Sequence, residues 1–138
     1  MDRVIALLRD RNHCLEKFYW INEQELINFG VGNFDAVEEF YQARDKILDH
    51  IKVIDGMISE ENSRENVVVT DVHRSEAQIL LASKDELVKS ILAQDLQVLT
   101  YIEKEKSNII RELRGNAQAK KAVGAYASSE RLKVLDGE

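Results

Sequence analysis

Residues 71–113 form one uninterrupted stretch of 43 residues without proline or glycine, and this stretch limits what the chain can fold into. Apolar residues recur in it every three or four positions, which is the spacing of one face of a helix. A continuous helix of this length would be roughly 65 Å long. Because a chain of 138 residues cannot enclose such a helix in a globule, we expect it to be the spine of an elongated bundle.

One face of this stretch carries apolar residues at alternating spacings of three and four, with one carboxylate and one lysine among them. We expect this face to point toward the core of the bundle. Two sequences that resemble capping boxes, at residues 75–78 and 83–86, also allow a later helix start or a bend near Ser83. The face consists of Leu81, Val88, Leu92, Asp95, Leu99, Ile102, Lys106, Ile109 and Leu113.

The composition favours helices throughout the chain. Proline is absent and charged residues make up 32% of the sequence, so the strongest helix breaker is missing and long charged side chains are abundant. We therefore predict an all-α fold, an elongated antiparallel three-helix bundle with a long third helix and a short C-terminal helix or mobile tail. The predicted division is a helical bundle over residues 1–113, followed by the short helix and tail over residues 114–138.

A segment with two glycines marks where the first helix is expected to end. Residues 1–28 have a wide apolar face, and Gly30 and Gly32 then indicate a turn. Asp35 with Glu38 resembles a capping box for a second helix that ends near residue 61, and Asn33 is an alternative cap.

The remaining connections and the end of the chain are less regular. Residues 62–70 contain three consecutive valines and are expected to form a long loop or a flap. Residues 114–116, Arg-Gly-Asn, indicate a helix stop, and residues 127–138 have few apolar anchors. Trp20 lies outside the narrow apolar stripe of the first helix, so it is either partly buried at a bundle edge or exposed for contact with a partner.

Arg44 falls on the apolar face of the second helix, where an unpaired guanidinium would cost several kcal/mol. Asp95 is the carboxylate on the facing stripe of the spine. We therefore predict an Arg44–Asp95 pair that sets the register of the second and third helices. The alternative is that Arg44 extends to solvent.

The sequence offers no pattern that indicates catalysis or a bound metal. A di-metal bundle needs two Glu-x-x-His motifs, and the chain has only Asp10-x-x-His13. His50 lacks the surroundings of a phosphotransfer histidine, and Cys14 is expected to be a small core residue. We therefore expect no enzyme activity and no cofactor.

Charge and hydropathy indicate a soluble protein of the cytoplasm. A net charge of −6 without a cluster of basic residues argues against a nucleic-acid partner. The single cysteine excludes an internal disulfide and suits a reducing compartment. No apolar run reaches the ~18 residues of a membrane span, and no signal-peptide core is apparent at the start.

Three segments, in this order, resemble the FlgN/FliT-like flagellar type III export chaperones. The first is GNFDAVEEFYQARDKILDHIKVID at residues 32–55, a small loop, an Asp and then a helix with an Arg-Asp pair. The second is ILAQDLQVLTYIEKEKSNIIREL at residues 91–113, like a third helix with a central Asp and a late Lys. The third is AKKAVGAY at residues 119–126, like a short basic segment ending in tyrosine. Together they cover roughly half of the chain, whereas residues 62–70 fit the pattern poorly.

The resemblance implies a cytoplasmic chaperone that binds a late flagellar substrate and delivers it to the type III export gate. The implied partners are the C-terminal helical region of a filament-cap or hook-associated protein and the cytoplasmic domain of the gate, which Tyr126 would contact. Helix-in-groove recognition uses apolar anchors at helical spacing. The candidate partner-binding residues are Leu99, Ile102, Ile109, Leu113, Lys120, Lys121, Val123 and Tyr126.

Two further possibilities remain open from the sequence. The apolar candidates on the spine can instead be part of the chain's own core, and the tail can cover the groove when no substrate is bound. The competing class is a non-enzymatic helical-bundle adaptor or coiled-coil dimerisation protein. The wide apolar face of residues 1–28 favours a folded monomer or weak dimer, whereas a narrow a/d seam favours a coiled coil.

Overall fold

The computed structural model describes residues 1–64 and 67–136, with side chains described up to residue 121 and at 123 and 124. These residues form three helices and no strand: α1 (Asp2–Gly30), α2 (Val37–Asn62) and α3 (Asp71–Asp136). The all-α prediction is therefore confirmed. The chain divides into two compact units, Met1–Val98 and Leu99–Glu138.

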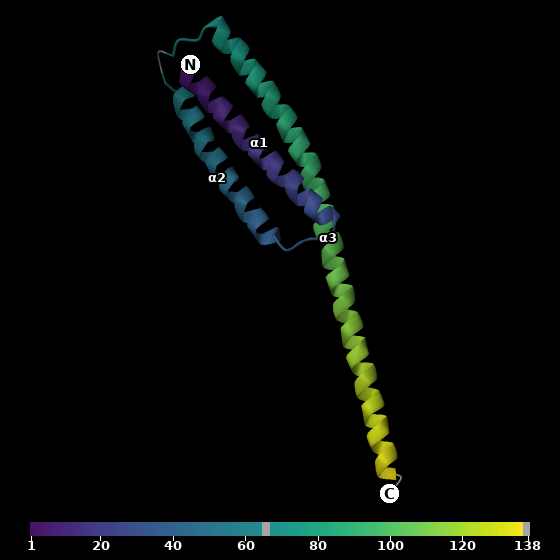
Figure 1. Ribbon diagram of the computed structural model, residues 1–138. Helices are drawn as coiled ribbons and strands as arrows, with labels where there is room; N and C mark the ends of the chain where they lie inside the picture. The colour runs from purple at the N-terminus through teal and green to yellow at the C-terminus, as the bar shows by residue number, and fades with distance from the viewer. Residues whose placement is uncertain (65–66, 137–138) are drawn as a thin grey trace. The chain divides into compact units, whose positions relative to one another are not determined.

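A tight turn joins α1 to α2 in the first unit, and the two helices run side by side (Figure 1). Gly32 has a φ of +78°, a left-handed conformation that favours glycine. Asn33 accepts a hydrogen bond from the backbone N–H of Asp35 at 3.0 Å, which makes a local Asx turn. The prediction that Asp35 or Asn33 caps α2 is wrong, because Ala36 occupies the N-cap position and no side chain caps the helix.

The start of α3 is a reciprocal cap made by a threonine and a histidine. The backbone N–H of His73 donates to Thr70 Oγ1 at 3.1 Å, and the backbone N–H of Thr70 donates to His73 Nδ1 at 3.2 Å. Because Nδ1 accepts, the neutral ring carries its proton on Nε2, which faces Asp2 Oδ1 of α1. The helix therefore begins at Asp71. Ser83, near which the sequence allowed a late start or a bend, lies inside the helix.

The apolar core of the first unit is built mainly by α1 and α2. Residues from α3 complete it at its edge, where Ala77 and Leu80 are partly buried. At the end nearer the α1–α2 turn, Phe29 stacks on Phe34 with ring centroids 4.7 Å apart and meets Phe40 edge-on. The buried residues of the core are Val4, Ile5, Leu7, Leu8, Cys14, Ile54 and Ile58.

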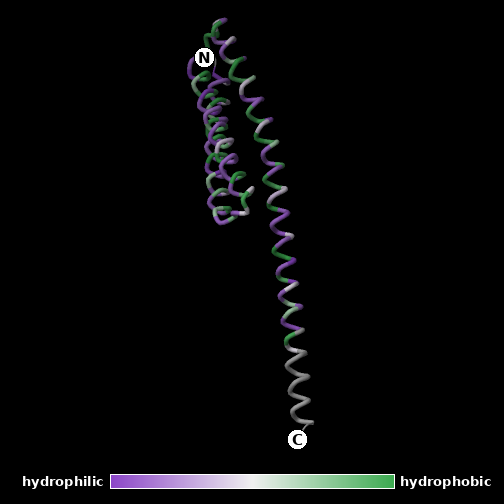
Figure 2. Tube along the Cα trace, turned by 45° about the vertical axis from the view of Figure 1, so that its right-hand side comes forward, coloured by the Kyte–Doolittle hydropathy of each residue, from purple (hydrophilic) through white to green (hydrophobic). Residues whose placement is uncertain are grey.

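The inner face of α3 in this unit is not the face predicted from the sequence. Ile91, Gln94 and Val98 are buried, whereas Leu92 is 59% exposed and Leu81 is also exposed. The inner face therefore lies part of a turn away from the predicted stripe, and a buried glutamine interrupts its apolar pattern. Figure 2 shows hydrophobic and hydrophilic residues alternating every few positions along α3.

The second unit, Leu99–Glu138, consists of the remainder of α3. The stop expected at residues 114–116 lies inside this helix, and a Cβ added at Gly115 would meet no neighbouring atom. A glycine in a helix costs about 1 kcal/mol relative to alanine but does not by itself end the helix. The predictions about apolar anchors in residues 127–138 concern side chains that lie outside those described.

Candidate functional site

The predicted partner-binding residues lie along the second unit's part of α3. Leu99, Ile109, Leu113 and Val123 are exposed, Ile102 is half-buried, and both Lys120 and Lys121 are exposed. All except Lys121 follow the same helical face, since Lys121 is one residue beyond Lys120 and projects in another direction. The Tyr126 side chain lies outside the described residues.

This face continues without a break from Leu99 to Val123, and we call it the seam. Three of its positions are polar, and each interrupts an otherwise apolar series at a spacing of three or four. Leu113 is 63% exposed, so the seam presents large apolar side chains to solvent. Its members are Leu99, Ile102, Lys106, Ile109, Leu113, Asn116, Lys120 and Val123.

A shallow hollow lies on the C-terminal half of the seam. Ala117, Ala119 and Gly124 have small side chains or none, and they leave space beside the larger Leu113 and Val123. Asn116 and Lys120 supply an amide and an ammonium at its border. Such a hollow can accept an apolar side chain from another helix and can hydrogen-bond a polar one. From the sequence, Asn116 is expected only as part of a helix stop, and its place beside this hollow is not predicted.

Arg44 and Asp95 are brought together by α2 and α3 in the first unit. Arg44 Nη2 donates to Asp95 Oδ1 at 3.0 Å, and the side chains are 14% and 35% exposed respectively. The guanidinium carbon also lies 4.7 Å from the ring centroid of Phe18 and 5.0 Å from that of Phe40, which adds cation–π attraction. The predicted contact is present, whereas its role in setting the helix register remains a prediction.

Two amides extend this pair into a network across all three helices of the first unit. Asn22 of α1 is fully buried, and its Nδ2 donates to Gln94 Oε1 at 3.0 Å and to Asp95 Oδ1 at 3.3 Å. Gln94 Nε2 donates in turn to the carbonyl of Tyr19 and to Glu23 Oε1. The inward position of Gln94 was not predicted from the sequence, because an amide on an amphipathic helix usually indicates a surface residue.

Cys14 and His50 form a second contact between α1 and α2. The Cys14 Sγ lies 3.6 Å from His50 Nδ1. Burial raises the pKa of the Cys14 thiol, and the smaller effect of Lys17 in the opposite direction does not cancel it. The thiol is therefore protonated near neutral pH, which makes it a packing residue and not an activated nucleophile.

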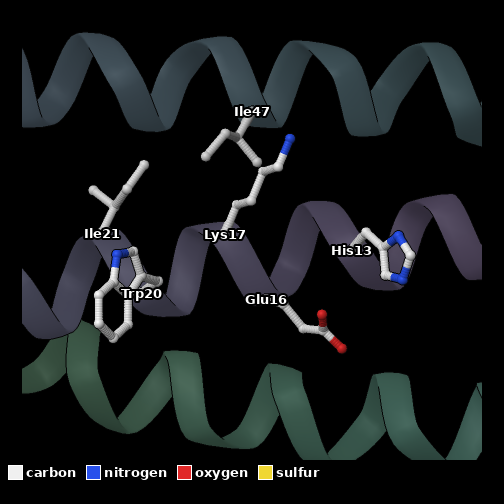
Figure 3. A pocket seen from close by; sticks show the side chains of 6 residues that line it. All are labelled: His13, Glu16, Lys17, Trp20, Ile21 and Ile47. Carbon is white, nitrogen blue, oxygen red and sulfur yellow. The ribbon is translucent and has the colours of Figure 1, made fainter.

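Trp20 of α1 lines a hollow to which Ile47 of α2 also contributes (Figure 3). Its side chain is 63% exposed, which exceeds the partial burial expected at a bundle edge. Ile21 of α1 and Ile47 of α2 point toward each other beside it, with Lys17 at the border. An exposed indole next to an apolar hollow is suited to contact with a protein partner.

Among the side chains that the structure describes, no three His, Cys, Asp or Glu residues are placed to hold a metal ion. As far as the chain is described, no helix is both long and apolar enough to cross a membrane. No protein-family model, curated protein sequence or solved structure matches the chain.

Proposed function

We propose that the protein is a non-enzymatic chaperone of the FlgN/FliT-like kind, which binds an amphipathic helix of a late flagellar substrate in the cytoplasm. The observation that carries the proposal is the exposed seam, because it presents large apolar side chains at helical spacing over some 25 residues. Exposed apolar surface of this kind is typical of a binding site. We also propose that the architecture is an elongated antiparallel bundle with a long third helix.

The helix of the bound substrate, which we call the guest helix, would pack its apolar face against the seam. Ile109 and Leu113 would be the central anchors, and the hollow beside Ala117 would receive one guest side chain. The resemblance suggests the C-terminal helical region of a filament-cap or hook-associated protein as the guest. It also suggests that the segment ending at Tyr126 contacts the cytoplasmic domain of the export gate.

The hydrogen bonds among polar side chains inside the first unit also support a binding role. Arg44 and Asn22 both donate to Asp95, and Asn22 also donates to Gln94. These polar groups stabilise the scaffold and are not directed at a substrate. A guest-binding chaperone needs such a scaffold and an apolar surface, and it needs no catalytic group. The proposal therefore includes the absence of enzyme activity and of a cofactor.

The test is a pull-down from the source cell with the full chain as bait, followed by titration of the recovered guest. Recovery of a filament-cap or hook-associated protein supports the proposal. The Leu113→Asp variant should then bind that guest at least about tenfold more weakly, since a charge at a central apolar anchor loses the contact and must be desolvated.

Ile79→Asp is the matched control, because Ile79 is also on α3, is 66% exposed and lies outside the seam. Its guest affinity should equal that of the unmodified protein. Recovery of cytoplasmic enzymes alone, or equal loss of binding in both variants, would count against the chaperone function.

A further inference from the structure

The seam has the spacing of a coiled coil. Its positions alternate by three and four residues from Leu99 to Val123, a little over three heptads, which is near the shortest length at which such pairing is stable. In heptad notation the a positions are Leu99, Lys106, Leu113 and Lys120. The d positions are Ile102, Ile109, Asn116 and Val123.

The two lysines disfavour parallel pairing of this helix with itself. In a parallel pair each a residue faces the same residue of the second copy, so Lys106 would meet Lys106 and Lys120 would meet Lys120. Two layers of like charge would then lie in the interface. Such layers oppose association by repulsion and by the cost of removing both ammonium groups from water.

Antiparallel pairing separates the like charges, because a positions then face d positions. With the twofold axis at residue 111, Lys106 faces Asn116 of the second copy, so the ammonium can donate to the amide oxygen. Ile109 faces Leu113 at the centre, and Leu99 faces Val123 at the ends. A shift of one heptad in either direction separates Lys106 from Asn116 and shortens the paired region.

The neighbouring positions agree with this register. Ile110 stands at e, where antiparallel helices bring like positions together, so two further isoleucines join the apolar centre. Lys120 faces Ile102 close to the end of the paired region, where its long side chain reaches solvent. Glu112 approaches its own copy at the exposed rim, a repulsion that salt screens.

We propose that two copies of this chain pair in antiparallel orientation through the seam, centred on residue 111. The pairing goes beyond the proposed chaperone function and does not depend on it, since it follows from the seam alone. Because a guest helix would use the same residues, a guest and a second copy would exclude each other.

The first test is sedimentation equilibrium of the full chain from about 1 µM to 1 mM, a range that would detect even weak dimers. The expected result is a reversible monomer–dimer equilibrium that shifts toward dimer with added salt. Leu113→Asp should abolish the dimer, whereas Ile79→Asp should leave it unchanged. A monomer at all concentrations, or a dimer that Leu113→Asp leaves intact, overturns the proposal.

Orientation is tested by disulfide crosslinking in a Cys14→Ala background with two separate variants, Ile102→Cys and Lys120→Cys. In the antiparallel pair the two copies of residue 102 are ~27 Å apart, far beyond the ~7 Å that a disulfide spans between Cα atoms. A mixture of the two variants should therefore crosslink, and each variant alone should not. Rapid crosslinking of either variant alone indicates parallel pairing and overturns the proposal.

These outcomes separate the self-pairing from the chaperone function. A dimer with the expected crosslinks but no flagellar guest in the pull-down would contradict the chaperone function alone. A guest that binds a chain which stays monomeric at every concentration would contradict the self-pairing alone. Far-UV circular dichroism of each variant shows whether the substituted chain is still folded.

Discussion

At the scale of single residues, the Arg44 guanidinium contacts a carboxylate and three aromatic rings, although arginine side chains are mostly exposed to solvent. One carboxylate oxygen lies 3.0 Å from it, and the rings of Phe18, Phe40 and Tyr41 surround it, the last at 5.6 Å. Asp95 also accepts from Asn22, so removal of the guanidinium would leave this carboxylate with an amide as its described donor.

Arg44→Met is expected to lower the free energy of unfolding by about 1–3 kcal/mol. Breaking a buried ion pair can cost 3–5 kcal/mol, but Asp95 is 35% exposed and solvent compensates part of the loss. Urea unfolding followed by circular dichroism measures the change. Arg74→Met is the control, because the ion pair of Arg74 with Asp71 is at an exposed site and its loss should change stability by less than about 0.5 kcal/mol. Equal stability of both variants would mean that the Arg44 pair does not hold the helices.

The buried thiol predicts a pH dependence of stability above neutrality. Because burial raises the Cys14 pKa, the folded chain retains the thiol proton at a pH where the unfolded chain has lost it. The contribution is fully present below the unfolded pKa of about 8.5 and decreases as the pH rises from there toward the folded pKa. The unfolding free energy should therefore fall more steeply between pH 8 and 10, roughly, in the unmodified protein than in Cys14→Ala.

Lysines and tyrosines titrate in the same range, but they are common to both proteins, so the difference between the two curves isolates Cys14. Parallel curves would show that the thiol is not perturbed by folding. The same experiment with His50→Ala separates the effect of burial from that of the neighbouring ring.

At the scale of helices, the structure assigns the start of α3 to Thr70, and not to either serine that resembles a cap. Thr70→Ala removes the acceptor for the His73 N–H and should lower the free energy of unfolding by about 1 kcal/mol. Thr70→Ser retains an acceptor and should change the free energy of unfolding by only a few tenths of a kcal/mol. Ser83→Ala should be neutral or slightly stabilising, since Ser83 lies within the helix. Thermal unfolding of the three variants measures these effects. A larger loss for Ser83→Ala than for Thr70→Ala would contradict the assigned start.

The all-helical fold could be predicted from the sequence because long charged and apolar residues repeat with one period and proline is absent. The inner face of α3 could not, because Gln94 belongs to it and the more regular leucine series does not. The cap at Thr70 was missed since its partner at the third position is a histidine and not Glu or Gln. Arg44 and Asp95 were predictable as a pair because a charge on an apolar face requires a counter-charge, whereas amides carry no such requirement.

At the scale of the whole molecule, the two units differ in what stabilises them. The helices of Met1–Val98 share a buried core and a polar network, whereas the described apolar side chains of the seam are largely exposed. An isolated helix without tertiary packing is marginally stable in water. In dilute solution we therefore expect hydrogen exchange at residues 103–121 to be much faster than at residues 14–25 of α1.

The same measurement at high concentration should show increased protection confined to the seam region, since pairing of two copies buries it. Residues 14–25 should not change and act as the internal control. Equal protection of both regions in dilute solution would contradict a seam that is exposed in the single chain.

The exposure of Trp20 has a practical consequence for spectroscopy, because it is the only tryptophan of the chain. An indole that already meets water in the native state emits much as it does in the unfolded chain, so intrinsic fluorescence is a poor reporter of unfolding for this protein. The same property makes it a sensitive reporter of any partner that covers this part of α1. A blue shift of its emission on adding a partner would locate contact at the hollow beside Ile47 without any label.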